Sequence, residues 1–257
     1  MSILDMFKLE GKTTIVTGGG RGLGAIIAKT YAEVGANVVV CSRKLDACLE
    51  MRDTLKNMGV DSLAFECDVV NPDDVKRVVK ETYDHFGAID ILVNNSGASW
   101  GAPVEEMPFD AWNKVMNVNV TGTFLMSQEV GKVMIKQKQG KIINISSIAA
   151  FGGTNPAYLD AIGYNASKSA VSTFTKDLAV KWGKYNINVN AIAPGFFPTK
   201  MTRGILDEKA EKILEDTPLN RLGSDDDLKG AALFLASPAS DYVTGDVLLV
   251  DGGMKAK

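Results

Sequence analysis

Short apolar runs rich in β-branched residues alternate along the chain with longer segments in which apolar residues recur every three or four positions. The short runs are typical of buried parallel strands, and the longer segments of amphipathic helices. Strands are predicted over residues 13–18, 37–42, 62–69, 89–97, 140–146, 187–195 and 245–253. Helices are predicted over residues 23–35, 45–59, 73–87, 109–138, 163–184 and 226–236.

This regular alternation of strand and helix predicts an α/β fold. Parallel strands need crossover connections, and helices in those connections cover both faces of the sheet. We therefore expect a doubly wound, Rossmann-type sheet. No flexible linker or shift of composition divides the chain, so residues 1–257 are predicted to form a single dinucleotide-binding and catalytic domain.

Composition and charge exclude several classes of function. With 46% hydrophobic residues and a net charge of −3, the chain has no basic surplus for nucleic acid. Its single histidine, His85, cannot form a multi-histidine metal site, and no metal is expected. Cys41, Cys48 and Cys67 lack a disulfide or zinc spacing and indicate free thiols. Without a signal-peptide pattern or an 18-residue apolar run, we expect a cytoplasmic protein that does not bind membranes.

A glycine-rich segment, TGGGRGLG at residues 17–24, joins the first predicted strand to the first predicted helix. Glycines at such a turn let backbone N–H groups approach a pyrophosphate, whose charge the helix N-terminus favours. The spacing leaves three residues between Gly18 and Gly22, as in the loop of the short-chain dehydrogenase/reductase family. The residues predicted to bind a dinucleotide here are Gly18, Gly20, Arg21, Gly22, Leu23 and Gly24.

Further motifs resemble that family in the order it requires: NNSG at 94–97, NVTG at 119–122, INISS at 143–147, a Tyr-x-x-x-Lys pair, and APGFFPTKM at 193–201. The chain is identified as a member on these motifs, and the resemblance covers nearly all of it. Membership implies seven parallel strands with the site at their carboxyl edge. It also implies four catalytic residues, Asn119, Ser147, Tyr164 and Lys168.

Tyr164 and Lys168 stand one helical turn apart and share a helix face, so the ammonium can lie beneath the phenol. A nearby cation is expected to lower the tyrosine pKa from its ordinary value of about 10. Tyr164 would then give a proton to a carbonyl oxygen that Ser147 also binds, while a nicotinamide delivers hydride to the carbon. The resemblance adds that Lys168 holds the nicotinamide ribose and that Asn119 holds a water.

The second predicted strand indicates which cofactor is used. An NAD enzyme of this type ends that strand with an acid that binds the ribose 2′-hydroxyl, whereas this chain has Ser42 followed by Arg43. A guanidinium can bind a 2′-phosphate, which predicts NADP(H). The resemblance assigns the rest of the cofactor site to Asp68, Val69, Asn95, Ser96, Gly97, Tyr164, Lys168, Pro194, Gly195, Phe197 and Thr199.

The substrate is predicted from loops that follow the motifs. Trp100, Phe196 and Met201 suggest an apolar pocket. Ser147 and Tyr164 stand 17 residues apart, more than is usual in the family, and the extra residues (within TNPAYLDAI) are expected to shape the pocket mouth, with Tyr158 or Leu159 as a wall. Nearby, Lys200 and Arg203 could serve a carboxylate, a phosphopantetheine or an acidic carrier protein.

The apolar residues favour an NADP(H)-dependent 3-oxoacyl thioester reductase or general carbonyl reductase, acting on a small-molecule carbonyl that is free or bound to CoA or a carrier protein. Parts of the chain resemble 3-oxoacyl reductases, including the branch linked to rhamnolipid synthesis, and other parts resemble gluconate 5-dehydrogenases. A gluconate 5-dehydrogenase or another sugar or polyol dehydrogenase is therefore the alternative. A non-catalytic nucleotide sensor is less favoured, because all four catalytic residues are present. The resemblance also implies a homotetramer.

Overall fold

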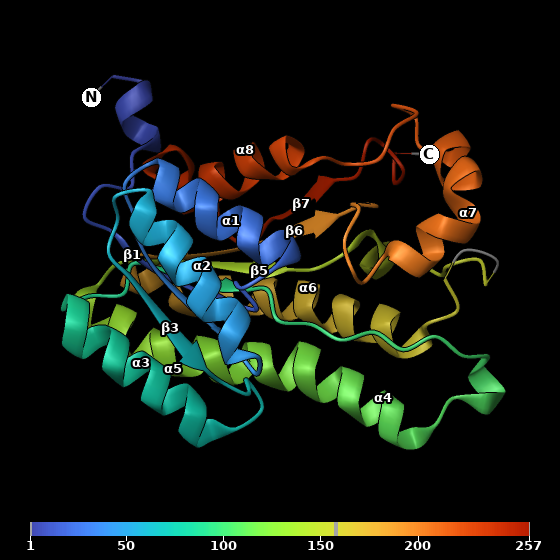
Figure 1. The fold of residues 1–257 in the computed structure, drawn as a ribbon, viewed down its shortest axis with the longest axis horizontal. Coiled ribbons are helices and arrows are strands. Elements are labelled where there is room, and N and C mark those ends of the chain that lie inside the picture. The colour runs from blue at the N-terminus through green and yellow to red at the C-terminus, as the bar shows by residue number, and fades with distance from the viewer. Residues whose placement is uncertain (1, 157–158, 257) are drawn as a thin grey trace.

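All seven strands of the computed structural model, which describes residues 2–156 and 159–256, form one parallel sheet (Figure 1). Their order is β3-β2-β1-β4-β5-β6-β7. The strands are β1 (Thr13–Thr17), β2 (Asn37–Ser42), β3 (Ser62–Glu66), β4 (Ile91–Asn94), β5 (Gly140–Ile145), β6 (Ile187–Pro194) and β7 (Val247–Val250). The predicted seven-stranded, doubly wound α/β fold is confirmed.

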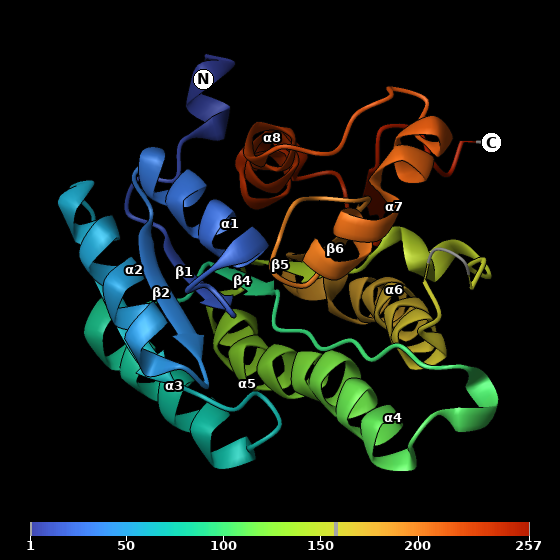
Figure 2. The same ribbon diagram turned by 45° about the vertical axis from the view of Figure 1, so that its right-hand side comes forward.

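Helices cover both faces of this sheet, as Figures 1 and 2 show. One layer contains α1 (Gly22–Glu33), α2 (Leu45–Asn57) and α8 (Asp225–Ala236). The other contains α3 (Pro72–Phe86), α4 (Phe109–Met116), α5 (Gly122–Gln137) and α6 (Ile162–Trp182). Alternate residues of one strand point to opposite layers, so Val38 and Val40 pack with the first layer and Val39 with the second.

The helices begin and end where local chemistry dictates. At the start of α3, the Asn71 side chain accepts a hydrogen bond from the backbone N–H of Asp73, and Pro72 occupies the first turn. Gly87 ends this helix in the left-handed conformation. Ser224 and Asp227 form a capping box at α8, and Arg221 pairs with the same Asp227 carboxylate.

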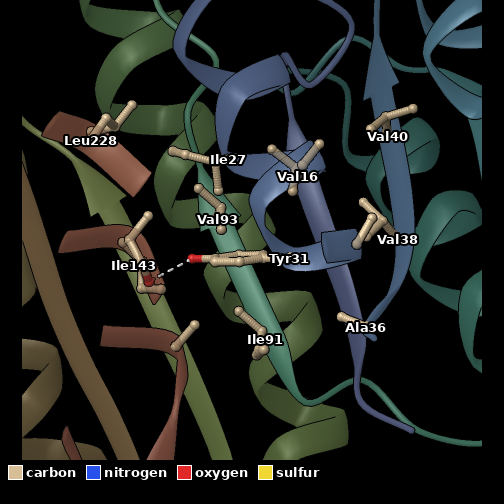
Figure 3. Close-up of a cluster of buried hydrophobic side chains, with 14 of the residues drawn as sticks. Val16, Ile27, Tyr31, Ala36, Val38, Val40, Ile91, Val93, Ile143 and Leu228 are labelled. Carbon is tan, nitrogen blue, oxygen red and sulfur yellow. Dashed lines mark hydrogen bonds between the residues drawn. The ribbon is translucent and has the colours of Figure 1, made fainter. Parts of the chain in front are cut away.

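Tyr31 joins α1 to α8 in the core between that layer and the sheet (Figure 3). Its ring is fully buried among aliphatic side chains, and its hydroxyl donates to the carbonyl oxygen of Ala232 at 3.0 Å. Burying a phenol without a partner is costly, so this bond lets a large ring fill the core. The contact holds α8 against α1.

Two features depart from the predicted elements. The predicted helix over 109–138 is interrupted by a π-helical turn at Asn117–Thr121, a local widening that often marks a functional site. In addition, α7 (Arg203–Asp216) was not predicted. It lies beyond the carboxyl ends of the strands, outside both helical layers (Figures 1 and 2).

The described residues also bear on the exclusions drawn from composition. All three cysteines are buried and free. None of the described helices combines the length and the apolar character that a membrane crossing needs. Nor do the described side chains include a group of three or more His, Cys, Asp or Glu residues that could hold a metal ion.

Candidate functional site

A cleft of about 1290 Å³ lies at the carboxyl edge of the sheet. The strand order reverses between β1 and β4, and ligands of doubly wound sheets bind in the crevice outside such a reversal. The cleft is lined by the glycine loop after β1, the segments after β2, β3 and β4, the start of α6, and α7. It therefore gathers the segments that the motifs had singled out.

The glycine loop is held against the end of β4 by Asn95. The Asn95 side chain donates to the carbonyl oxygens of Thr17 and Gly18 at 2.8 and 3.2 Å. In return, the Thr17 hydroxyl accepts from the backbone N–H groups of Asn95 and Ser96, both at 3.0 Å. This reciprocal bonding fixes the loop at the N-terminus of α1, where the helix dipole favours an anion.

Gly24 belongs to this loop but does not line the cleft. A Cβ atom at Gly24 would lie 2.4 Å from the amide nitrogen of Asn95 and 2.5 Å from the carbonyl oxygen of Gly18. That Gly24 contacts the cofactor stays a prediction, and the structure gives it a packing role. Its lack of a side chain allows α1 to pack closely on the loop, a role the motif also requires.

The far end of the cleft is positively charged. Arg21, Arg43 and Lys44 line it, and no carboxylate stands at the end of β2. The Ser42 hydroxyl is used locally, because it accepts from the Lys44 N–H at 3.2 Å and donates to the Lys44 carbonyl at 3.1 Å. Among the described residues Arg43 has no ion-pair partner, so its guanidinium is available to a ligand.

Ser147, Tyr164 and Lys168 meet at the other end of the cleft. Ser147 is the second residue after β5, and Tyr164 and Lys168 lie on the first turns of α6. The Lys168 ammonium donates to the carbonyl oxygen of Ile145 at 2.7 Å and lies 5.6 Å from the centre of the Tyr164 ring. Three predicted catalytic side chains thus line the same cleft as the glycine loop.

Burial is the main cause of the pKa shifts of Tyr164 and Lys168. It lowers the pKa of the Lys168 ammonium to about 8. Burial also raises the pKa of the Tyr164 phenol above its ordinary value, and a hydrogen bond with Ser147 only partly opposes this. The shift is therefore opposite to the predicted lowering, because burial of the phenol outweighs the hydrogen bond with Ser147; the prediction also counted the charge of a bound nicotinamide.

Asn119, the fourth predicted catalytic residue, lies behind the cleft wall and is 1% exposed. Its amide oxygen accepts from the Ala98 N–H at 2.7 Å, and its amide nitrogen donates to the Ala98 carbonyl and the Ser167 hydroxyl. Ser167 in turn donates to the backbone carbonyl of Tyr164 at 2.7 Å. Within the chain, this side chain joins the π-helical turn to the catalytic helix.

The remaining predicted site residues are the substrate residues and the other cofactor residues. Of the predicted substrate residues, Trp100 and Met201 line the cleft, whereas Phe196 faces a second cavity on the other side of Phe197. The structure thus does not bring Phe196 to the cleft with the other predicted substrate residues. The prediction for Tyr158 concerns a residue outside those that the structure describes. All the other predicted cofactor residues line the cleft: Gly18, Gly20, Arg21, Gly22, Leu23, Ser42, Arg43, Asp68, Val69, Asn95, Ser96, Gly97, Pro194, Gly195, Phe197 and Thr199.

Sequence reasoning missed part of the substrate end. Ile205 and Lys209 of α7 line the cleft, as do Pro103 and Asp160. Lys200 lines it too, and had been noted only as a nearby cation. The motifs do not include α7, and the available signal was the repeat of Met201, Ile205 and Lys209 at four-residue intervals.

Comparison with known proteins agrees with this geometry. A family model described as Enoyl-(Acyl carrier protein) reductase matches residues 18–255. The 2-dehydro-3-deoxy-D-gluconate 5-dehydrogenase of Pseudoalteromonas atlantica is 41% identical over 256 residues, covering 98% of each chain. The 3-oxoacyl-[acyl-carrier-protein] reductase FabG of Aquifex aeolicus is 36% identical over 248 residues, covering 96% of this chain and 98% of that protein.

A solved structure extends the similarity to three dimensions. The gluconate 5-dehydrogenase of Burkholderia cenocepacia J2315, crystallised in complex with NADP and tartrate, superimposes with a TM-score of 0.95 at 37% identity over the full length of both chains. Sequence and structural similarity of this extent show that the chain belongs to the short-chain dehydrogenase/reductase family, whose members are oxidoreductases acting on CH–OH groups.

Proposed function

We propose that this enzyme interconverts a ketone and a secondary alcohol with NADP(H), using Tyr164 as the proton donor and acceptor. The convergence of Ser147, Tyr164 and Lys168 on a cleft that also contains the glycine loop carries the proposal. The cleft suits a phosphorylated dinucleotide, because its far end presents the cations Arg21, Arg43 and Lys44. Relatives with NADP in their crystal structures support the same cofactor.

The proposed chemistry follows from the geometry. NADPH, when bound, supplies the hydride that adds to the carbonyl carbon. Ser147 donates a hydrogen bond to the carbonyl oxygen, and the Tyr164 hydroxyl transfers its proton there, so the C=O group becomes CH–OH. The raised pKa keeps Tyr164 protonated at neutral pH, as a proton donor requires. Lys168, charged below a pKa of about 8, stabilises the phenolate that remains.

Asn119 is proposed to act through the backbone. Its bonds to Ala98 and Ser167 hold the segment after β4 against α6. In the family, the equivalent asparagine holds a water that passes protons to the lysine. We propose the same role for Asn119 toward Lys168. Replacing Asn119 would disturb the positions of Tyr164 and Lys168 together.

Two substrate classes compete within this activity. Trp100, Met201 and Ile205 give the substrate end apolar surface, which supports the 3-oxoacyl thioester or general carbonyl reductase, with a substrate free or bound to CoA or a carrier protein. The curated relatives include sugar-acid dehydrogenases at 41% identity, which supports a gluconate-type substrate. Lys200 and Lys209, which line the cleft, favour the second class because it carries a carboxylate. Pro156, Leu159 and Asp160 line the cleft and support a substrate-shaping role for the extra residues before α6.

Replacing Tyr164 by Phe tests the mechanism. Because the general acid is lost while the ring remains, we expect kcat to fall roughly 10²–10⁴-fold, with NADPH binding changed less than about twofold. Turnover is followed by NADPH absorbance with 3-oxoesters, diketones and 5-keto-D-gluconate, and binding by fluorescence titration. Tyr185→Phe, outside the cleft, is the control. Full activity in the Tyr164 variant would refute the mechanism, and NADPH binding by the wild type without turnover of any ketone would favour the sensor alternative.

Replacing Arg43 by Ala tests the cofactor preference. Loss of a charge-assisted hydrogen bond of about 1.5–3 kcal/mol should raise the KM for NADPH about 10- to 100-fold and leave the KM for NADH nearly unchanged. Steady-state kinetics with both cofactors measure the ratio. Arg52→Ala is the control, because Arg52 lies on α2 outside the cleft and its side chain pairs with Asp53. Equal losses with both cofactors would contradict a 2′-phosphate site at Arg43.

We also propose a homotetramer. Phe109, Phe124 and Val180 are exposed apolar residues on α4, α5 and α6, and Leu249 is an exposed residue of the edge strand β7. Exposed apolar residues on neighbouring elements are typical of an interface. Light scattering after gel filtration should give about four times the 27.5 kDa of one chain, and Val180→Glu should lower it, whereas Lys76→Glu on α3 should not. A monomeric wild type would contradict the proposal.

A further inference from the structure

The α7 helix presents one stripe of residues to the body of the protein. Ile205, Lys209 and Ile213 recur every four positions and therefore share a helix face. Ile213 is fully buried, and Ile205 and Lys209 line the cleft. Lys209 thus occupies an inward-facing position between two isoleucines, where an apolar residue would ordinarily be expected.

Lys209 is half-buried and has no acidic partner among the described residues. Lys200, on the loop before α7, lines the same cleft and likewise lacks an ion-pair partner there. By contrast, Lys141 pairs with Asp241 and Lys181 with Asp177. Two unpaired ammonium groups in the substrate end of a cleft form an attractive site for an anion.

Asp160, on the segment before α6, is a charged residue that lines the same cleft. Its backbone carbonyl accepts from the Ala102 N–H at 2.9 Å, which ties the segment before α6 to the loop after β4. Asp160 lines the cleft, and its carboxylate is not ion-paired with either lysine. It can therefore accept hydrogen bonds from substrate hydroxyl groups, while the lysines bind an anionic group.

We propose that Lys209 and Lys200 bind the carboxylate of a short keto acid whose ketone lies at Ser147 and Tyr164. This rests on the proposed function and narrows its substrate class to hydroxylated ketones that carry a carboxylate. A folded acidic carrier protein could reach the exposed Lys200, but it could not reach a half-buried lysine that faces the cleft between Ile205 and Ile213. The position of Lys209 therefore favours a small anion within the substrate itself.

Matched ketones that differ only in charge test the subsite. The probes are 4-oxopentanoate and 5-oxohexanoate, each beside its methyl ester, together with 5-keto-D-gluconate. For the wild type we expect kcat/KM at least about tenfold higher for each acid than for its ester. Lys209→Gln should raise the KM for the acids about tenfold with little change in kcat or in the ester kinetics, and Lys209→Arg should restore most of the preference. Lys200→Gln should have a smaller effect of the same kind.

Lys212→Gln provides the matched control, because Lys212 lies on the same helix but does not line the cleft. Asp160→Asn should raise the KM for 5-keto-D-gluconate more than that for 5-oxohexanoate. The subsite is refuted if the wild type reduces acid and ester equally well, or if Lys209→Gln and Lys212→Gln behave alike. The proposal would also be overturned if a 3-oxoacyl thioester on a carrier protein were reduced faster than the keto acids and Lys209→Gln left that activity unchanged. In that case the lysines would not bind a substrate carboxylate.

Failure of the proposed activity can be distinguished from failure of the proposed carboxylate subsite. If the wild type turned over no ketone at all, calorimetric titration with 5-keto-D-gluconate would still decide the subsite. Binding that is lost in Lys209→Gln but kept in Lys212→Gln would support it, whereas binding that is equal in both variants, or absent from the wild type, would overturn it.

Discussion

The site is organised around one buried cation. Lys168 is only 5% exposed, and its ammonium donates to the carbonyl oxygen of Ile145 at 2.7 Å. Taking a charge out of water is costly unless it is bonded, and the remaining cost is visible in a pKa lowered to about 8. The bond joins the end of β5 to α6. It therefore fixes the helix that holds Tyr164 relative to the strand that leads into Ser147.

The surrounding polar bonds reinforce the same junction. Asn119 ties the segment after β4 to Ser167 on α6, and Asn95 ties that segment to the glycine loop after β1. The Asn119–Ser167 bond joins two side chains, whereas the bonds of Asn119 to Ala98 and of Asn95 to Thr17 use backbone groups at the carboxyl edge of the sheet. The proposed hydride and proton transfers meet at this edge, because the elements that hold the dinucleotide and the catalytic helix are bonded to one another.

The sequence predicted most of this molecule, for physical reasons that can be named. Buried strands such as 37–42 are continuous apolar runs. The spacing of the glycines in the loop and the spacing of Tyr164 and Lys168 are each typical of only a few kinds of protein. What it could not predict depends on surroundings. The direction of the Tyr164 pKa shift depends on how deeply the phenol is buried, and Phe196 lines a second cavity because of how its loop folds. Most of α7 is polar, and only a short stripe of its residues faces inward. Lys209 was missed for that reason.

The pH dependence of the reductive reaction tests the role of the buried cation most directly. Because the ordinary lysine pKa of 10.5 is lowered to about 8, the ammonium is present below pH 8 and lost as the pH rises through that value. In the reductive direction kcat/KM for NADPH, which reports groups of the free enzyme, should therefore fall above about pH 8, approaching tenfold per pH unit. A value that stays constant or rises up to pH 10 would contradict a functional charge on Lys168.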